Sequence, residues 1–256
     1  MKIEQVAVQL YTLREHLTTP EDYQSSLQKV AEIGYKSVQV SGPRPISEME
    51  IASLCAEKGL VINSSHEDSD LILNNPDKVV ENLEAFGCRY TAYPFPKGID
   101  FQSEESVHGL VKGLDASGKV LAEAGKVLTY HNHAVELDLL DGVPILDIIY
   151  GETDPQYLQG EIDTYWIHVG DSSPEAWCAR LRDRLPLLHI KDCRIDEEGN
   201  PQFAEIGNGI LDFRTIIATA EASGCQWFIV EQDTCPGDPF DSLEMSFRYI
   251  RDNLVD

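Results

Sequence analysis

Basic residues are scarce in this chain. Its 256 residues include 20 lysines and arginines against 44 aspartates and glutamates, which gives a formal net charge of -24. A surface of this charge repels phosphate backbones and anionic lipid headgroups. Nucleic acids and membranes are therefore not expected as partners.

Long apolar runs and paired cysteines are also missing. No window approaches the roughly 18 apolar residues of a membrane-spanning helix, and the opening MKIEQVAVQL lacks the apolar core of a signal peptide. The six cysteines are scattered without a CxxC pair, which fits reduced thiols. These absences predict a cytoplasmic protein.

The length and composition suit a large folded domain. A chain of 256 residues with 42% hydrophobic content can bury an ample core in one large domain or at most two small ones. The sequence shows no linker and no low-complexity tract. We therefore predict a single domain over residues 1–256.

A short pattern that ends in glycine recurs along the chain. It reads AEIG at 31–34, AEKG at 56–59, EAFG at 84–87, AEAG at 122–125 and EASG at 221–224. Each copy closes a segment with helical apolar spacing, and each is followed by a β-rich run. Glycine commonly ends a helix because it adopts the left-handed conformation at little cost. Five helix–glycine–strand junctions predict alternating units and a parallel sheet.

Three further β-rich runs bring the number of predicted strands to eight. The strands are expected at 3–10, 35–40, 60–65, 88–93, 126–131, 157–163, 185–190 and 225–230. Helices are expected near 20–33, 47–58, 76–86, 104–124, 144–151, 174–184, 212–223 and 239–253. Eight such units in this length predict an α/β fold, a single (β/α)8 TIM barrel with parallel strands. The alternative is an open doubly wound sheet, but VQLYTLREHL lacks its glycine-rich turn after the first strand.

Reactive side chains gather where the predicted strands end. In a barrel of this kind the chemistry lies at the carboxyl ends of the strands. The residues found there are His66, His131, His133, Glu136, Glu161, Asp163, His168, His189, Lys191, Asp192, Glu231 and Asp233. Only two of the seven histidines, His16 and His108, fall clearly outside this set.

Four of these residues, each after a different strand, could form one metal site: Glu136, Asp163, His189 and Glu231. Three carboxylates and one imidazole favour Mn²⁺, Mg²⁺ or Co²⁺, and Zn²⁺ is also compatible. Strand alternation puts Glu136 out of phase with His131, so a bulge or turn near Ala134 is needed if both point inward.

A series of motifs now shows a likeness to a known family. In chain order they are VQLYTLR (8–14), IGYKSVQV (33–40), YHNHAVEL (130–137), GEIDTYWIHVGD (160–171), LLHIKDC (187–193), EIGNGILDF (205–213) and FIVEQD (228–233). The chain resembles the sugar isomerase/epimerase branch of the xylose-isomerase-like TIM barrels, which includes ketose 3-epimerases and inosose dehydratase. The likeness covers nearly the whole chain and is more specific for the fold and metal site than for the substrate.

The resemblance implies a metal-dependent sugar isomerase or epimerase. Its family's ligand set falls on the same four residues, and it implies that His168 contacts the substrate. His66, His133 and Lys191 are expected in the pocket on weaker grounds. Glu136 and Glu231 would then transfer protons through an enediolate of a keto or aldo sugar or sugar derivative. Family members often form dimers or tetramers, so a homo-oligomer stays open.

Three other functions compete with this reading. A lyase could use the same metal and base for inosose-type dehydration or β-elimination of a 3-keto-glycoside. A zinc-dependent apurinic endonuclease shares the fold, but the charge opposes DNA binding. A sugar-binding barrel without activity is the third, and the complete quartet speaks against it.

Two smaller features have plain alternatives. GNG at 207–209 is predicted as a turn, with a phosphate cradle as the alternative. Lys191 is predicted to bind substrate. The alternative is that it only forms a salt bridge with Asp192 or Glu231.

Overall fold

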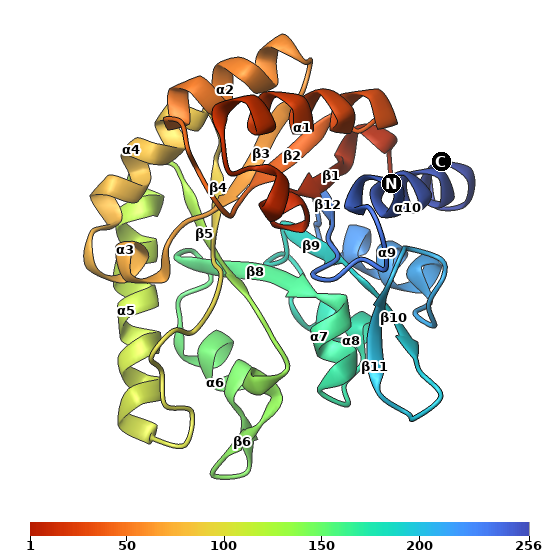
Figure 1. Cartoon of the computed structure of the whole chain (residues 1–256). Coiled ribbons are helices and arrows are strands. Elements are labelled where there is room, and N and C mark those ends of the chain that lie inside the picture. Colours follow the sequence, from red (N-terminus) through yellow and green to blue (C-terminus); the bar gives the residue numbers. More distant parts are fainter. Residues whose placement is uncertain (256) are drawn as a thin grey trace.

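A computed structural model describes residues 1–255, and eight parallel strands close into a barrel in it (Figure 1). The order around the barrel is β1-β12-β9-β8-β5-β4-β3-β2. The strands are β1 (Val6–Gln9), β2 (Ser37–Val40), β3 (Val61–His66), β4 (Tyr90–Tyr93), β5 (Val127–His131), β8 (Leu158–Asp163), β9 (Leu187–Ile190) and β12 (Trp227–Val230). The predicted (β/α)8 barrel is confirmed.

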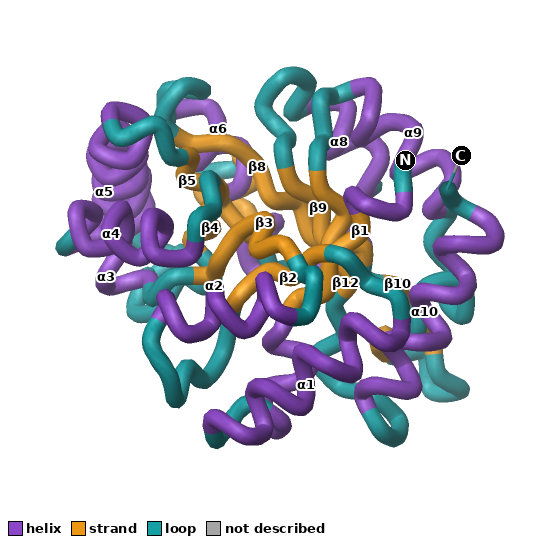
Figure 2. Tube along the Cα trace, turned by 90° about the horizontal axis from the view of Figure 1, so that it is seen from above, coloured by secondary structure: helices purple, strands orange, loops and turns teal. Residues whose placement is uncertain are grey.

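Helices surround the strands as an outer ring (Figure 2). The eight that were predicted are α1 (Pro20–Ile33), α2 (Glu48–Glu57), α4 (Pro76–Phe86), α5 (Glu104–Glu123), α6 (Ile145–Glu152), α8 (Pro174–Arg180), α9 (Phe213–Ala222) and α10 (Pro239–Asn253). Side-chain caps fix several starts. The Thr19 hydroxyl accepts the amide of Asp22, and Ser47 forms a capping box with Glu50.

Several short elements were not predicted. They are η1 (Ile3–Gln5), η2 (Leu10–His16), α3 (Ser69–Asn74), η3 (Val135–Leu137), β6 (Leu139–Leu140), β7 (Val143–Pro144), α7 (Thr164–Val169), β10 (Asp192–Ile195) and β11 (Pro201–Ala204). All except η1 lie in the connections that follow the carboxyl ends of the strands. The η3 turn has Ala134 as its N-cap, the position where a turn was expected if His131 and Glu136 both point inward.

The barrel closes between the first and last strands. β1 pairs in parallel with β2 on one side and with β12 on the other, with Ala7 opposite Ser37 and Ile229. All eight strands run the same way, so their carboxyl ends meet at one mouth. The reactive residues of the sequence are thereby brought to one end of the molecule.

The barrel interior has an apolar end and a polar end. Ala7, Tyr90, Leu187 and Ile229 form a small buried cluster of their own. Two residues further along three of these strands stand Gln9, His189 and Glu231, all buried. Because strand side chains alternate, these pairs share the inward face. The apolar cluster forms the floor, and polar side chains fill the barrel towards its mouth.

The helices of the described residues, taken one by one, are all too short or too polar to cross a membrane.

Candidate metal centre

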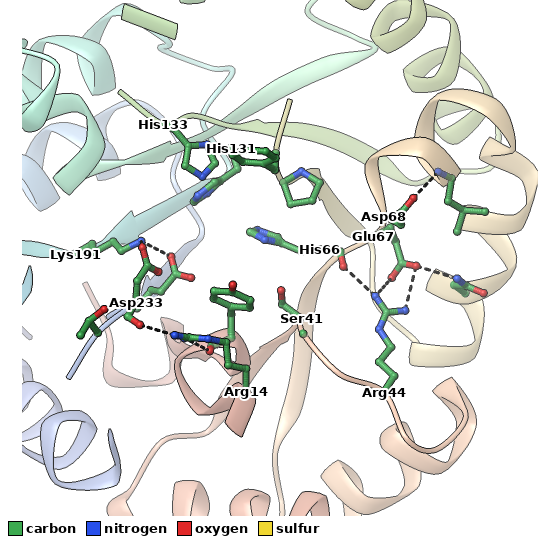
Figure 3. A pocket seen from close by; sticks show the side chains of 18 residues that line it. Arg14, Ser41, Arg44, His66, Glu67, Asp68, His131, His133, Lys191 and Asp233 are labelled. Carbon is green, nitrogen blue, oxygen red and sulfur yellow. Dashed lines mark hydrogen bonds and ion pairs between the residues drawn. The ribbon is translucent and has the colours of Figure 1, made fainter. Parts of the chain in front are cut away.

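A cavity of about 810 Å³ opens at the carboxyl ends of the strands. Its lining includes His66, His131, His133, Lys191 and Glu231. Figure 3 shows Lys191 beside Asp233 on one side of this cavity, across from the paired Arg44 and Glu67. Its size falls within the range usual for small-molecule sites.

Four buried side chains at the cavity form a potential ligand set. One atom each from His131, Asp163, His189 and Glu231 lies within 4.8 Å of the others. The Nδ1 atom of His189 is 3.0 Å from Oε2 of Glu231, and Nε2 of His131 is 3.8 Å from Oδ2 of Asp163. The structure thus brings together three of the four predicted ligands and adds His131.

The Asp163 carboxylate is incompletely satisfied. Its Oδ1 accepts the amide of Trp166 at 3.0 Å, where Asp163 caps α7. Among the described residues, its Oδ2 accepts no hydrogen bond although it is buried. Buried oxygens normally have a partner. This oxygen lies 3.3 Å from the Lys191 ammonium and 3.8 Å from the His131 ring without a hydrogen bond from either, an arrangement that fits a divalent cation.

Lys191 supplies positive charge beside this group. Its Nζ lies 2.9 Å from Glu231, 3.3 Å from Asp163 and 3.0 Å from Asp233. Burial alone would lower the pKa of Lys191, but the three carboxylates outweigh it and raise the pKa well above its usual value. Lys191 is therefore a fixed cation, and its carboxylate partners include Glu231 and not Asp192.

Glu231 is held in its ionised form. Burial would raise the pKa of its carboxyl, but Lys191 and His189 outweigh that effect and hold the pKa well below its usual range. Glu231 lines the cavity, so an ionised carboxylate faces the space where a small molecule would lie.

Glu136 occupies a different position from the other predicted ligands. It follows β5 in the η3 turn, and its carboxylate accepts the Tyr130 hydroxyl at 2.9 Å and the His133 amide at 2.8 Å. It is buried, yet it belongs to neither of the two potential ligand groups found among the described residues. These hydrogen bonds hold the side chain back toward its own strand.

The second of these groups contains His66, His131, Glu161 and His189. Glu161 lies two residues before Asp163 on β8 and is fully buried. Sequence analysis listed it among the reactive residues at the strand ends and gave it no role, although strand alternation puts it on the same face as Asp163. The shared face was the signal that could have marked it, because every inward residue near the strand end reaches the site.

The electrostatics of this buried group are strongly coupled. Burial would raise the pKa of Glu161, but His66 and His189 outweigh it and the pKa lies well below its usual range. Burial would lower the pKa of His189, but Glu161 and Glu231 raise it to about 10. Burial dominates at His131 and lowers its pKa well below the usual range. Neighbouring charges thus favour the ionised forms of Glu161 and His189, whereas burial favours the neutral ring of His131.

The residues predicted to contact substrate divide into two sets. His66, His133 and Lys191 line the cavity. His168 lies in the last turn of α7, half-buried, and is not among the described residues that line it. The reason is that α7 begins directly after Asp163 and leads the chain away from the strand end.

The GNG segment is a turn that holds the protein's own carboxylate. Asp192 Oδ2 accepts the amides of Gly207 at 2.9 Å and Gly209 at 3.0 Å, and its Oδ1 accepts those of Cys193 and Leu211. A Cβ at Gly209 would come within 2.2 Å of the Asp192 carboxylate. The turn prediction is confirmed, and the amides that could have held a phosphate are already in use.

Comparison with known proteins agrees with this architecture. A family model described as xylose isomerase-like TIM barrel matches residues 27–252. The chain belongs to this family. The resemblance proposed from the late-strand motifs is thereby confirmed.

Curated relatives of this xylose isomerase-like barrel include enzymes named inosose dehydratase. That of Bacillus velezensis is 29% identical over 181 residues, which cover 60% of this chain and 57% of the relative. Relatives of this name align over 52% to 66% of their own length. The relatives are enzymes, in line with the class of protein predicted from the sequence.

Solved structures share the fold at low sequence identity. A sugar phosphate isomerase/epimerase from Parabacteroides distasonis has a TM-score of 0.84 and 21% identity, over 99% of this chain and 96% of that one. A xylose isomerase-like TIM barrel protein from Mycobacterium smegmatis in complex with magnesium has a TM-score of 0.75 and 14% identity, over 96% and 95% of the two chains.

Proposed function

We propose that this protein is a divalent-metal-dependent enzyme that moves a proton next to a carbonyl group of a keto or aldo sugar, as an isomerase or epimerase. The observation that carries the proposal is the buried group of His131, Asp163, His189 and Glu231, two of which line the cavity, with an oxygen of Asp163 that accepts no hydrogen bond from the described residues.

Asp163, His189 and Glu231 would hold the metal, and the fourth ligand is either Glu136, as the family resemblance implies, or His131, which lies in the group. When bound, a divalent cation polarises a carbonyl and a neighbouring hydroxyl and makes the C–H beside them more acidic. The donor set favours Mn²⁺, Mg²⁺ or Co²⁺. The magnesium in the related Mycobacterium smegmatis protein supports the same class of ion.

Glu231 would accept the substrate proton. Its carboxylate is ionised and faces the cavity. In the epimerase reaction Glu136, whose oxygens accept the Tyr130 hydroxyl and the His133 amide, would first take up a proton from solvent and then deliver it to the opposite face, while Glu231 keeps the proton it has removed. His66, His133 and Lys191 would orient substrate oxygens, because all three line the cavity.

A lyase is the second candidate, and the names of the curated relatives favour it. Inosose dehydratases remove water from their substrate, and such a reaction can begin with the same proton abstraction. The two functions differ in the fate of the carbanion, which is either reprotonated or expels a β-substituent. Elimination from a 3-keto-glycoside is the corresponding reaction with a sugar leaving group.

The test is a panel of keto sugars and inososes with Mn²⁺ in D₂O, followed by NMR and mass spectrometry. Deuterium at one carbon without loss of mass would show isomerisation or epimerisation, and loss of water or of a sugar would show a lyase. Glu231→Gln should lower exchange by roughly 10²–10⁴-fold, the usual contribution of general acid–base catalysis. Retained exchange in this variant would remove Glu231 as the base, and a panel without any reaction would contradict the proposal.

The fourth ligand can be tested separately from turnover. Mn²⁺ affinity should fall strongly in Glu136→Gln if Glu136 is a ligand, and in His131→Gln if His131 is. Titration calorimetry on both variants distinguishes these alternatives.

A further inference from the structure

Glu161 is a buried carboxylate at which three histidines converge. Its Oε1 lies 2.5 Å from Nε2 of His66, 3.2 Å from Nδ1 of His131 and 3.1 Å from Nε2 of His189. Its side chain is fully buried between the apolar floor and the cavity. Buried carboxylates are stable only when charged or polar donors satisfy them, and here the imidazoles are among those donors.

His189 turns its two ring nitrogens to opposite sides. Nδ1 faces Oε2 of Glu231 at 3.0 Å, on the side of the proposed metal. Nε2 faces Oε1 of Glu161 at 3.1 Å and Oε1 of Gln39 at 2.7 Å. The ring also stacks on His66, with centroids 5.4 Å apart and an interplanar angle of 10°.

The orientation of the Gln39 amide follows from Glu161. A carboxylate is only an acceptor, so the Gln39 atom 2.7 Å from Oε2 of Glu161 must be the NH₂ group. The same NH₂ donates to Oγ of Ser64 at 2.8 Å. The Gln39 oxygen must then face His189, and it also accepts the Gln9 amide at 2.6 Å. Glu161 thus fixes the orientation of the Gln39 amide and also contacts His189 directly.

Both groups next to Nε2 of His189 are therefore acceptors. This nitrogen must carry a hydrogen, because two facing acceptors without one would repel each other. Nδ1 faces the Glu231 carboxylate at 3.0 Å, and a cation held with Asp163 and Glu231 would take the place of the hydrogen between them. The second hydrogen bond of a metal-binding histidine commonly sets its tautomer in this way.

We infer that Glu161 is a positioning residue for the metal. It holds His189, directly and through Gln39, with hydrogen on Nε2 and with Nδ1 aimed at the ion. This inference rests on the metal site of the proposed function, but it requires no turnover. It assigns Glu161 to the support of one ligand and not to a second metal site made with His66 and His131.

The experiment measures Zn²⁺ binding in the absence of substrate, since Zn²⁺ is diamagnetic and allows NMR. Wild-type protein should bind one Zn²⁺, and ¹⁵N NMR should show His189 with a proton on Nε2 and metal on Nδ1. In Glu161→Gln the affinity should fall about 10–100-fold, as is typical when such a partner is removed, and the signals of His189 should shift or split between tautomers.

Glu205→Gln is the matched control. Glu205 is also buried, and its carboxylate accepts the Ser242 hydroxyl at 2.9 Å, away from the histidines. This control should keep wild-type Zn²⁺ affinity and the same His189 signals. An equal loss in both variants would overturn the inference, because the effect would then not depend on the contacts of Glu161 with His189.

Two other results would overturn the inference. One is wild-type affinity and unchanged His189 signals in Glu161→Gln. The other needs no variant: wild-type protein with metal on Nε2 of His189, or with two bound Zn²⁺ ions, would mean that Glu161 is a ligand. These outcomes are independent of any sugar reaction, so failure of the inference and failure of the proposed function can be told apart.

Discussion

Two buried aspartates near the mouth of the barrel differ in how completely they are satisfied. Asp192 accepts four backbone amides, from Cys193, Gly207, Gly209 and Leu211. Asp163 accepts the Trp166 amide through one oxygen and no hydrogen bond through the other, within the described chain. The first carboxylate completes a local structure, whereas the second is available to a ligand.

The adjacent residues Lys191 and Asp192 show how one strand end serves both purposes. Alternation sends Lys191 toward Asp163 and Glu231 and sends Asp192 toward the loop at 207–211. A carboxylate that meets four amide donors needs no further partner. A carboxylate beside a lysine and imidazoles, such as Asp163, is instead able to bind a cation. Substitution of Asp163 should therefore weaken metal binding, whereas substitution of Asp192 should lower the stability of the fold.

The largest effect is expected for metal binding at Asp163. Asp163→Asn keeps an oxygen to cap α7, because asparagine is a good N-cap residue. It removes the anionic oxygen, so Mn²⁺ affinity should fall by more than about 100-fold, beyond the usual loss for an outer partner. Calorimetric titration measures the affinity.

The thermal stability of the metal-free Asp163→Asn protein is the companion measurement. It should match or exceed that of the wild type, since an incompletely satisfied charge has been removed. A variant that unfolds easily but binds Mn²⁺ normally would reverse the roles assigned to the two aspartates.

The next effect is a loss of stability at Asp192. Asp192→Asn places an NH₂ group against two of the backbone amides, and each buried donor left unsatisfied costs about 1–3 kcal/mol. The free energy of unfolding should fall by roughly 3 kcal/mol, which lowers the melting temperature by about 6–12 °C in a chain of this size. Mn²⁺ affinity, measured well below the melting temperature, should stay at the wild-type level. An unchanged melting temperature would show that the turn does not depend on this carboxylate.

The last prediction concerns the pH dependence of the metal-free protein. The pKa of His189 is about 10 in the folded protein against an ordinary value of 6.5, because Glu161 and Glu231 outweigh burial. A pKa raised by folding gives stability that is fully present below about 6.5 and is lost as the pH rises through about 10. Denaturant titrations should show a steeper decline across this window in wild type than in His189→Gln. Equal slopes would mean that His189 is neutral without metal.

The strands were predictable because their signal is repeated. Glycine just after a helix and a β-rich run shortly beyond it recur five times, and three further β-rich runs complete the set of eight strands. The helices α3 and α7 have six residues each and follow a strand end almost directly. Such short helices contain too few turns to show an apolar period, and tertiary contacts stabilise them instead.

The sequence predicts which strand ends carry the site residues, but it does not predict the distances between those residues. Asp163, His189 and Glu231 meet because each stands at or just after the end of a neighbouring strand. Glu136 lies beyond β5 in a turn, where strand alternation no longer gives the direction of a side chain. Glu161 was left without a role because its function, as we infer it, acts through His189 and depends on atomic contacts that spacing does not encode.

The seam between β1 and β12 has a consequence for how the protein is made. During synthesis β1 leaves the ribosome first, and its neighbour β12 arrives more than 200 residues later. Until then two strand edges stay open, and open edges invite pairing with other chains. Glu231 follows β12 directly, so the residue proposed as the base reaches the cavity in the same event that removes the exposed edges.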